Sequence, residues 1–316
     1  MRSLLAQKYP EFEVIVVDDR SEDATAEILE RLQKTEKRLR LVRGEPLPQG
    51  WVGKPWALSQ GAKMARGEWL LFTDADTVHK PEASAAAIEH ANEHALDVLS
   101  LLTEQELVTP AERLFLPSIL WTIIFATGSL ADVNDPKSEA SLFNGQYILM
   151  SRRVHDAIGG HAIVKNEIAE DLELCRRLKK DGRFRVALIG SDGIVRTRMY
   201  RSFAEIWNGF VKNFALGARG HEWKAAAGIT YFALIAPVTP LATVAALVLR
   251  QWTAATVLIG SLALAMGAAE YGMRASRFRR GSGLALPLGM TVMVAIFVTS
   301  VAKHARGGVT WRGRRY

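Results

Sequence analysis

Cysteine is almost absent from this sequence. Cys175 is the only cysteine among 316 residues, so the chain cannot form a disulfide within itself. This scarcity is consistent with a protein that faces a reducing compartment. The opening segment, MRSLLAQKYPEFE, also lacks an apolar core of the length that a secretory signal peptide requires. Neither feature is typical of a small secreted domain held together by disulfides.

Charged residues are missing from three long runs near the C-terminus. These runs are 225–249, 251–269 and 281–302. A helix needs about 20 apolar residues to cross a bilayer, and each run is long enough or nearly so. Buried helices of a large soluble core are the alternative, but the clustering of the runs at one end of the chain favours a membrane. We therefore predict transmembrane helices at about 225–249, 251–271 and 281–302.

Acidic residues are scarce in the same region. Residues 196–316 contain 16 Lys and Arg but 3 Asp and Glu, whereas residues 1–195 contain 24 and 30. A basic region beside apolar helices suits an anionic membrane surface. Nucleic acid is the competing partner for a basic protein, but the basic residues flank the apolar runs and no nucleic-acid-binding motif is present. We expect a membrane partner and no nucleic acid, with a first domain at 1–224 and a basic tail at 303–316.

Short apolar runs alternate with helical patterns in the N-terminal part of the chain. The unbroken run Val14–Val17 predicts a strand buried on both faces, as in a parallel sheet. The alternation predicts a three-layer α/β sandwich, in which ligands bind at the carboxyl ends of the strands. Further strands are expected at 69–72, 98–102, 143–150 and 185–189, and helices at 23–32, 85–94 and 170–178.

The uncharged segment 114–131 interrupts this α/β pattern and contains Pro117 and Gly128. A fourth membrane span is one interpretation of it. Because the segment lies inside the α/β domain, we instead expect a helix that lies in the membrane interface.

Two carboxylates, Asp74 and Asp76, follow the predicted strand 69–72 with one residue between them. Mg²⁺ and Mn²⁺ prefer oxygen ligands and are often held by one or two carboxylates together with substrate phosphates. A D-x-D sequence is most often part of a solvated loop, but this one lies directly after an apolar strand, which favours a binding role. We predict that Asp76 and Asp74 bind a divalent cation, Mg²⁺ or Mn²⁺.

Adjacent carboxylates also follow the first predicted strand, at Asp18 and Asp19. They repel each other unless a positive or hydrogen-donating group lies near them. Capping of the next helix by Ser21 or Asp23 is an alternative explanation of this polar segment. Both roles can hold at once.

Glu170 and Asp171 begin a predicted helix, and three arginines follow later in the chain. Negative charge is favourable at a helix N-terminus, which is the simplest interpretation of the acidic pair. The functional interpretation is a general base that accepts a proton. Guanidinium groups suit diphosphate oxygens because they form paired hydrogen bonds, and membrane-surface charge explains them equally well. The arginines are Arg196, Arg198 and Arg201.

The order of the motifs is more informative than any one of them. The segments are VDDRSED, GWVGKPWAL, LLFTDADT, NGQYILMSR, EDLELCRRLKKDG, RTRMYRS and WRGRRY. Together they resemble the family 2 glycosyltransferases of the GT-A fold, and the resemblance covers nearly all of the chain. It is greatest for the membrane subgroup that includes ceramide-glucosyltransferase-like enzymes and bacterial carotenoid- and hopanoid-associated transferases. The resemblance implies an α/β GT-A sandwich for nucleotide-diphospho-sugars, followed by C-terminal transmembrane helices.

This resemblance assigns a role to the acidic residues near the strands. Asp19 would bind a uracil-type base, with Asp18 beside it, and Lys54 would lie in the donor pocket. Asp74 would approach the ribose, and Asp76 would bind the metal.

The resemblance also assigns the later motifs. Asp171 would be the catalytic base, with Glu170 beside it. Related proteins carry a Q/R-x-x-R-W motif that binds the diphosphate. The matching stretch here keeps Arg198 but lacks the first residue and the tryptophan, so Arg196 and Arg201 are candidates to replace them.

The implied activity is an inverting transfer of a hexose from a nucleotide-sugar donor, expected to be a UDP-sugar. The acceptor would be a hydroxyl of a lipid-like molecule such as a carotenoid, hopanoid or glycolipid precursor. The enzyme would be a multi-pass protein of a bacterial-type inner membrane, with its catalytic domain in the cytoplasm. Transfer to a polyprenyl phosphate, or polysaccharide synthesis, is the alternative, although three spans are too few for the usual translocating channel, which argues against a synthase.

The sequence departs from this family at its start. Related proteins begin with an apolar strand that forms part of the base-binding pocket, whereas residues 1–7 resemble the end of the helix that follows that strand. We therefore expect the usual first strand to be lacking. A start site further upstream is the interpretation we favour. A fragment, or a protein that has lost donor binding and acts as an inactive membrane scaffold, would also explain it.

The apolar runs and the charges predict different topologies. Three crossings would place the first domain and the basic tail on opposite sides of the membrane, whereas the positive-inside rule favours the cytoplasm for both basic clusters. Pro237 and Pro240 would interrupt the first run and make it re-entrant or interfacial. The apolar lengths favour three crossings. The clusters are Arg274, Arg277, Arg279 and Arg280, and Lys303, Arg306, Arg312, Arg314 and Arg315.

Overall fold

The computed structural model divides the chain into two compact units. Unit 1 contains Met1–Glu104 and Thr127–Thr197, and unit 2 contains Gln105–Ala126 and Arg198–Tyr316. Unit 1 is therefore built from two stretches of chain with a segment of unit 2 between them. The predicted boundary at residue 224, and Arg277, Arg306 and Arg312, lie outside the described residues. The structure describes residues 1–127, 129–217, 227, 230–275, 278–305, 310–311 and 314–315.

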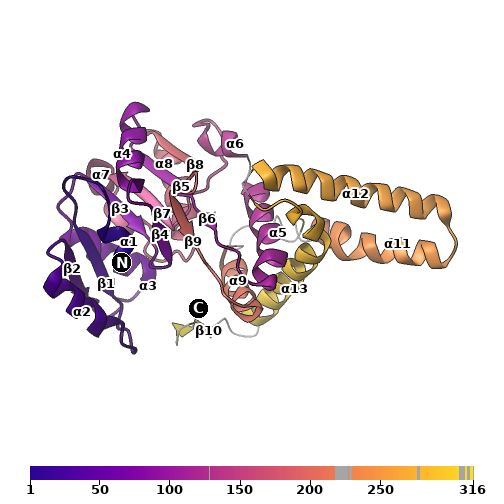
Figure 1. The fold of residues 1–316 in the computed structure, drawn as a ribbon, viewed down its shortest axis with the longest axis horizontal. Helices are drawn as coiled ribbons and strands as arrows, with labels where there is room; N and C mark the ends of the chain where they lie inside the picture. The colour runs from indigo at the N-terminus through magenta and orange to yellow at the C-terminus, as the bar shows by residue number, and fades with distance from the viewer. Residues whose placement is uncertain are drawn as a thin grey trace. The chain divides into compact units, whose positions relative to one another are not determined.

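The strands of unit 1 form a parallel pair, a mixed sheet and a smaller antiparallel sheet (Figure 1). In the mixed sheet, with order β3-β7-β5-β8, β7 runs antiparallel to both of its neighbours and β5 runs parallel to β8. The smaller sheet has the order β4-β9-β6. The strands are β1 (Val14–Asp18), β2 (Leu39–Arg43), β3 (Trp69–Thr73), β4 (Thr77–His79), β5 (Val98–Leu102), β6 (Glu104–Gln105), β7 (Tyr147–Ser151), β8 (Val186–Gly190) and β9 (Val195–Thr197).

Helices cover both faces of the mixed sheet. On one face, Leu174 and Leu178 of α8 pack in a core with Met150 of β7. On the other face, the alanines of α4 pack in a core with Leu99 and Leu149. The helices of unit 1 are α1 (Arg2–Leu5), α2 (Thr25–Thr35), α3 (Gly53–Met64), α4 (Ala83–Glu93), α6 (Leu130–Asn134), α7 (Arg152–Ala157), the 3₁₀ helix η1 (Gly160–Val164) and α8 (Glu170–Asp181).

Two strand predictions need correction. The first strand is parallel to β2, as expected, but Val14–Val17 are half-buried rather than buried on both faces. The reason is that β1 pairs with β2 along one edge, and among the described residues no strand pairs with its other edge. The strand expected at 143–150 begins only at Tyr147, because residues 143–146 form the loop that enters it.

Unit 2 is helical in most of its described residues. It contains α5 (Pro110–Thr127), α9 (Phe203–Gly217), the π-helical turn η2 (Leu234–Val238), α11 (Thr239–Val248), α12 (Trp252–Ala275), the 3₁₀ helix η3 (Ser282–Ala285) and α13 (Leu286–Ala305), with short strands β10 (Thr310–Trp311) and β11 (Arg314–Arg315).

Helices long and apolar enough to cross a membrane occur in unit 2 at each of the predicted places. Within the described residues these are Thr230–Val248, Trp252–Arg274 and Ser282–Lys303. The expected start of the first, residue 225, lies outside the described residues. The segment 114–131 is divided, since α5 ends at Thr127 and α6 begins at Leu130.

The prolines of the first apolar run do not end its helix. Pro237 lies in the π-helical turn η2, and α11 continues directly from it with Pro240 in its first turn. A widened turn accommodates a residue that has no N–H to donate. The hydroxyl of Thr239 donates to the carbonyl of Leu234 at 2.8 Å, which satisfies one backbone acceptor there. The prolines therefore change the hydrogen-bond pattern of the helix at Pro237 but do not end the helix.

Candidate active site

The turn Asp74-Ala75-Asp76 joins β3 to β4 and is held by hydroxyl groups. The hydroxyl of Thr77 donates to the carbonyl of Asp74 at 2.8 Å, and the hydroxyl of Thr197 donates to the carbonyl of Asp76 at 3.3 Å. His79 Nε2 lies 2.9 Å from the Thr77 hydroxyl and supports it in turn. Hydrogen bonds to its own backbone therefore fix the shape of the turn.

The carboxylates of this turn are suited to a divalent cation. Burial, together with the negative charge of Asp74, raises the pKa of Asp76 above its usual range. A cation would stabilise the ionised form of both groups. Among the described residues, no three or more His, Cys, Asp or Glu side chains are placed so that together they could hold a metal ion. The two carboxylates would therefore share the cation with substrate oxygens, as is usual for Mg²⁺ and Mn²⁺.

Lys54 connects this turn to the start of α8. It is the second residue of α3, and its Nζ lies 2.8 Å from Asp74 Oδ1 and 2.8 Å from Glu170 Oε1. Burial alone would lower the pKa of Lys54, but the carboxylates of Glu170 and Asp74 outweigh it and raise that pKa above its ordinary value. One ammonium group therefore bridges two carboxylates that are far apart in the chain.

Glu170 and Asp171 are neighbours with different surroundings. Burial raises the pKa of Glu170 to about 7, although the charge of Lys54 opposes this. The Asp171 carboxylate accepts hydrogen bonds from backbone N–H groups, that of Gly145 at 2.8 Å and that of Leu172 at 2.8 Å. These backbone donors fix the orientation of the Asp171 carboxylate.

Gly145 is a site residue that the sequence analysis did not identify. It lies in the loop before β7, and its N–H donates to Asp171. The surrounding atoms also leave no room for a side chain at this position. A Cβ atom at this position would lie 2.8 Å from Lys54 Nζ and 2.9 Å from Asp171 Oδ2. The motif NGQYILMSR was the available signal, but nothing in its local pattern indicates what the glycine contacts.

The acidic pair at the end of β1 has at least one structural role. Asp18 is buried, and its carboxylate accepts hydrogen bonds from Arg43 Nη1 at 2.8 Å and from the Ser21 N–H at 3.0 Å. Burial would raise the pKa of Asp18, but these hydrogen bonds lower it. Asp19 is one-third exposed and lies 3.7 Å from Arg20 Nε. Asp18 thus links β1 to β2 through Arg43, whereas Asp19 stays the candidate for contact with the nucleotide base.

The helix-capping alternative is supported in part: the N-cap residue of α2 is Ala24, which has no side-chain cap, but Asp23 bonds to the first turn. The Asp23 carboxylate accepts the N–H of Thr25, the first residue of α2, at 2.9 Å. Capping by Asp23 and ligand binding by Asp19 are compatible.

The predicted arginines are divided between the units. Arg196 is exposed in β9 of unit 1, whereas Arg198 and Arg201 belong to unit 2. Arg198 Nε donates to Oε1 of Glu112 in α5 at 2.8 Å, and the Glu112 side chain is fully buried. Burial would raise the pKa of Glu112, but Arg198 and the N–H groups of neighbouring residues lower it to about 2. Arg198 therefore has an internal carboxylate partner that the sequence analysis did not identify.

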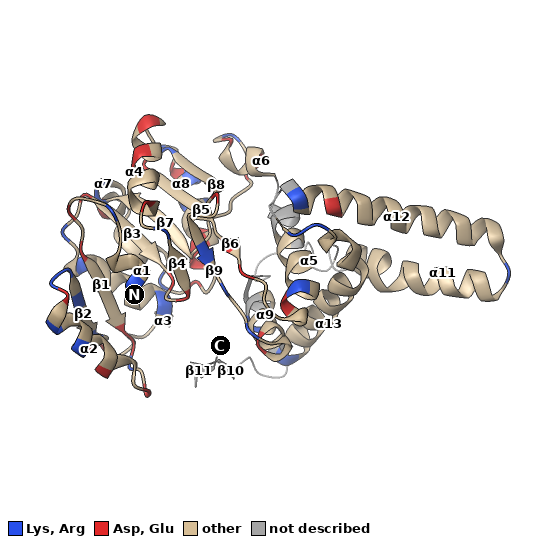
Figure 2. Ribbon diagram, viewed as in Figure 1, with Lys and Arg blue, Asp and Glu red and all other residues tan. Residues whose placement is uncertain are grey.

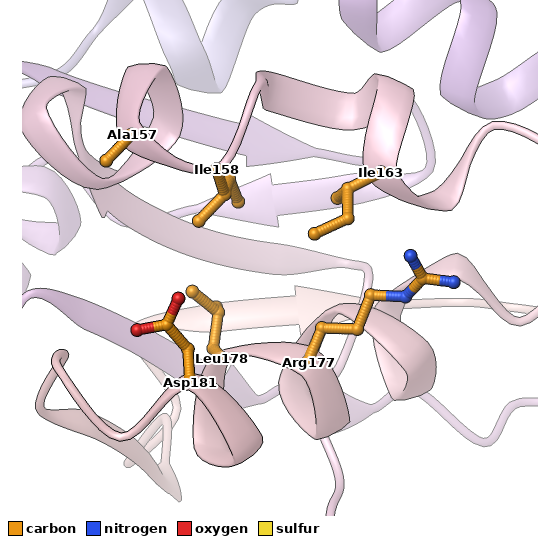
Figure 3. A pocket seen from close by; sticks show the side chains of 6 residues that line it. All are labelled: Ala157, Ile158, Ile163, Arg177, Leu178 and Asp181. Carbon is orange, nitrogen blue, oxygen red and sulfur yellow. The ribbon is translucent and has the colours of Figure 1, made fainter.

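A cavity of about 220 Å³ in unit 1 lies beside the last turns of α8 (Figure 3). Its floor is apolar, and Arg177 and Asp181 lie at its edge (Figure 3). It does not include Glu170 or Asp171, which begin the same helix. The lining residues are Ala157, Ile158, Ile163, Arg177, Leu178 and Asp181.

Sequence comparison finds a match over the N-terminal half of the chain. The family model described as glycosyl transferase family 2 matches residues 1–172. A 4,4'-diaponeurosporenoate glycosyltransferase of Staphylococcus haemolyticus is 27% identical over 217 residues, which are 68% of this chain and 56% of that protein. A poly(ribitol-phosphate) β-N-acetylglucosaminyltransferase of Staphylococcus aureus is 38% identical over 101 residues, 31% of this chain and 17% of that protein. The chain thus spans only part of the length of both relatives.

Among solved structures, the fold is similar to that of a mannosyltransferase from Pyrobaculum calidifontis in complex with GDP-Man and Mn²⁺. The TM-score is 0.52 at 20% sequence identity, and the match covers 96% of this chain and 81% of the other. At this identity the likeness shows the fold alone. It confirms the predicted GT-A sandwich.

Proposed function

Because the chain belongs to glycosyl transferase family 2, we propose that it transfers a hexose from a nucleotide-sugar to a lipid-like acceptor with inversion at the sugar. We take the donor to be a UDP-sugar and the acceptor group to be a hydroxyl. The observation that carries this proposal is the cluster of Lys54, Asp74, Glu170 and Asp171 in unit 1, which places candidate donor-binding and proton-accepting groups around one ammonium.

Asp171 is the base in this proposal. Its carboxylate, oriented by the Gly145 and Leu172 N–H groups, accepts the proton of the acceptor hydroxyl as that oxygen attacks the anomeric carbon. The bond between that carbon and the diphosphate oxygen breaks on the opposite face, so the configuration inverts and the nucleotide diphosphate leaves. Lys54 holds Asp74 and Glu170 in place on either side.

Asp74 and Asp76 would hold a divalent cation, which supplies Lewis-acid stabilisation of the departing diphosphate. The donor-bound mannosyltransferase of similar fold contains Mn²⁺. The candidate diphosphate ligands are Arg196, Arg198 and Arg201, of which Arg198 also pairs with Glu112.

The acceptor and the membrane location rest on unit 2 and on one relative. Within the described residues, unit 2 contains helices long and apolar enough to cross a membrane. The relative from Staphylococcus haemolyticus is a 4,4'-diaponeurosporenoate glycosyltransferase. We therefore propose a carotenoid, hopanoid or glycolipid precursor as acceptor, used at the cytoplasmic face of a bacterial-type inner membrane.

The base is tested with the variant Asp171→Asn. We expect it to bind the donor nearly as well as the unmodified protein, because its backbone partners remain, while transfer falls by roughly 10²-fold or more. Donor binding is measured by calorimetry, and transfer by following labelled sugar into the lipid fraction. Near-normal transfer by the variant would assign the base elsewhere. An unmodified protein that binds no nucleotide-sugar would favour the inactive scaffold.

The cation is tested by its removal. Transfer should stop in EDTA and return with added Mn²⁺ or Mg²⁺, because the diphosphate needs a counter-charge as it leaves. In Asp76→Ala the added cation should fail to restore transfer. Glu22→Ala, which changes an exposed carboxylate outside the cluster, serves as the control and should be restored like the unmodified protein. Full turnover in the chelator would remove the metal from the mechanism.

A further inference from the structure

The apolar helices of unit 2 differ in how they pack. α11 and α12 lie side by side and are joined by the turn 249–251, in which Arg250 adopts a left-handed φ of 56° (Figure 1). A turn this short makes the two helices antiparallel. Their side chains are largely exposed within unit 2, as shown by Val248 at 73% and Leu264 at 75%. Exposed apolar surface on both helices suits contact with lipid chains.

α13 is instead buried along one face from Leu286 to Ser300. Its inward side chains share a core with side chains of α5 and α9. Gly289 approaches α5 so closely that a Cβ atom there would lie 2.4 Å from the Ser118 side chain. The buried residues of α13 recur at helical spacing and are Leu286, Gly289, Met290, Met293, Ile296 and Ser300.

Both ends of α13 are tied to segments that carry charge. Before α13, the Glu270 carboxylate near the end of α12 accepts the N–H groups of Gly281 at 2.8 Å and Gly283 at 2.9 Å. Near its other end, the Ser300 hydroxyl donates to the carbonyl of Val211 in α9. The charge at the first end also includes Arg274, which pairs with Glu270.

α9 is not a membrane span. Its 15 residues give a helix of about 22 Å, shorter than the roughly 30 Å of a bilayer core. It also contains Glu205 and Lys212, which belong at the headgroup level or in water. α13 therefore runs between the charged end of α12 and a helix too short to cross a bilayer, so both of its ends contact segments suited to a membrane surface.

The distribution of basic residues agrees with this packing. Figure 2 shows α11 and α12 almost free of charge between the tip and the Glu270 end of α12. Basic residues lie before α13 and again after it, and the positive-inside rule favours the same side for both groups. They include Arg274, Arg279 and Arg280 before α13, and Lys303, Arg314 and Arg315 after its apolar part.

We infer that the α11–α12 hairpin crosses the bilayer and returns, whereas α13 does not cross but lies with α5 and α9 in the membrane interface on the basic side, with its exposed apolar side chains toward the lipid chains. This arrangement removes the conflict between apolar length and charge, because both basic groups then face the cytoplasm. The inference rests on the membrane attachment proposed above but not on sugar transfer, so each can fail without the other.

Single-cysteine variants of the full chain test this topology. Cys175→Ser provides the background, because Cys175 is the only native cysteine. Cysteines are then placed at the hairpin tip (Gln251→Cys), before α13 (Arg279→Cys) and in the tail (Thr310→Cys). Spheroplasts receive a membrane-impermeant maleimide before and after permeabilisation, and labelling after permeabilisation is the control for accessibility.

We expect Gln251→Cys to be labelled in intact spheroplasts, and Arg279→Cys and Thr310→Cys to be labelled only after permeabilisation. Labelling of Thr310→Cys before permeabilisation, with Arg279→Cys protected, would show that α13 crosses and would overturn the inference. Protection of Gln251→Cys would show that the hairpin does not reach the outer side, and would overturn it equally. None of these readouts depends on enzymatic activity.

Discussion

Gly145 lies against the charged atoms of Lys54, Asp171 and Glu170 in the candidate active site. Its N–H is one of the donors that orient Asp171, and its missing side chain leaves space for the Lys54 ammonium. A methyl group at this position would meet charged atoms from both sides. The cluster therefore depends on a residue that takes no part in the chemistry itself.

The variant Gly145→Ala tests this dependence. The added methyl should displace Lys54 or Asp171, and transfer should fall by roughly 10²-fold, the cost expected when a reacting group moves by about 1 Å. Gly190→Ala is the matched control, because a Cβ there would meet only Asp192 Oδ1 at 3.7 Å. The control should transfer sugar normally. Equal activities of the two variants would mean that the spacing around Gly145 is not critical.

At the scale of elements, α5 and the chain segment before α9 are joined by the pair Glu112–Arg198. Glu112 is fully buried, and it also accepts the backbone N–H groups of Val108 and Thr109. Removing only the cation of a buried ion pair lowers the free energy of unfolding strongly, because the carboxylate stays buried without a partner. Replacing both members of the pair by uncharged residues lowers it far less. The pair therefore makes each of these two segments dependent on the other.

A double-mutant cycle measures this coupling. Arg198→Met alone should destabilise the protein by about 3–5 kcal/mol, because it leaves Glu112 buried and uncompensated. The double variant with Glu112→Gln should recover a large part of that loss. Arg196→Met, which leaves the pair intact, is the control, and thermal unfolding in detergent is the measurement. If Arg198→Met has the unfolding temperature of the unmodified protein but binds the donor weakly, Arg198 is a diphosphate ligand and not a structural cation.

At the scale of the whole molecule, the two units are interleaved in sequence. The segment 105–126, with α5, leaves unit 1 and enters unit 2, after which the chain returns to complete unit 1. Leu116 and Ile119 of α5 are buried in the core that unit 2 builds from α9, α12 and α13. The chain therefore cannot be cut once to separate the units cleanly.

Truncation tests this interleaving. A fragment of residues 1–197 keeps α5 but loses its packing partners, so Leu116 and Ile119 become exposed and the fragment should aggregate without detergent. The same fragment with residues 107–126 replaced by a Gly/Ser linker should stay monodisperse. Size-exclusion chromatography in detergent-free buffer compares the two. A monodisperse unmodified fragment would contradict the assignment of α5 to unit 2.

Features that depend on neighbours in sequence were predictable. The runs that became β1, β3 and β5, the helix after Glu170 and the apolar helices of unit 2 are visible in hydrophobic pattern and length alone. The D-x-D turn and the Glu170-Asp171 pair were also evident, because each directly follows or begins such an element. β2 was not predicted. The strand at β7 was placed too early, because the loop residues 143–146, which include Gly145, directly precede its apolar run.

The order of the elements, the family resemblance and the positions of the acidic motifs follow from local composition and spacing, so they can be found in the sequence. The folded chain is needed to find that Lys54 bridges Asp74 and Glu170, that Gly145 orients Asp171, and that Arg198 pairs with Glu112. These contacts join residues far apart in the chain, and their geometry depends on how sheets and helices pack. For the same reason, the length of α13 indicates a membrane span, whereas its packing against α9 favours a position at the membrane surface.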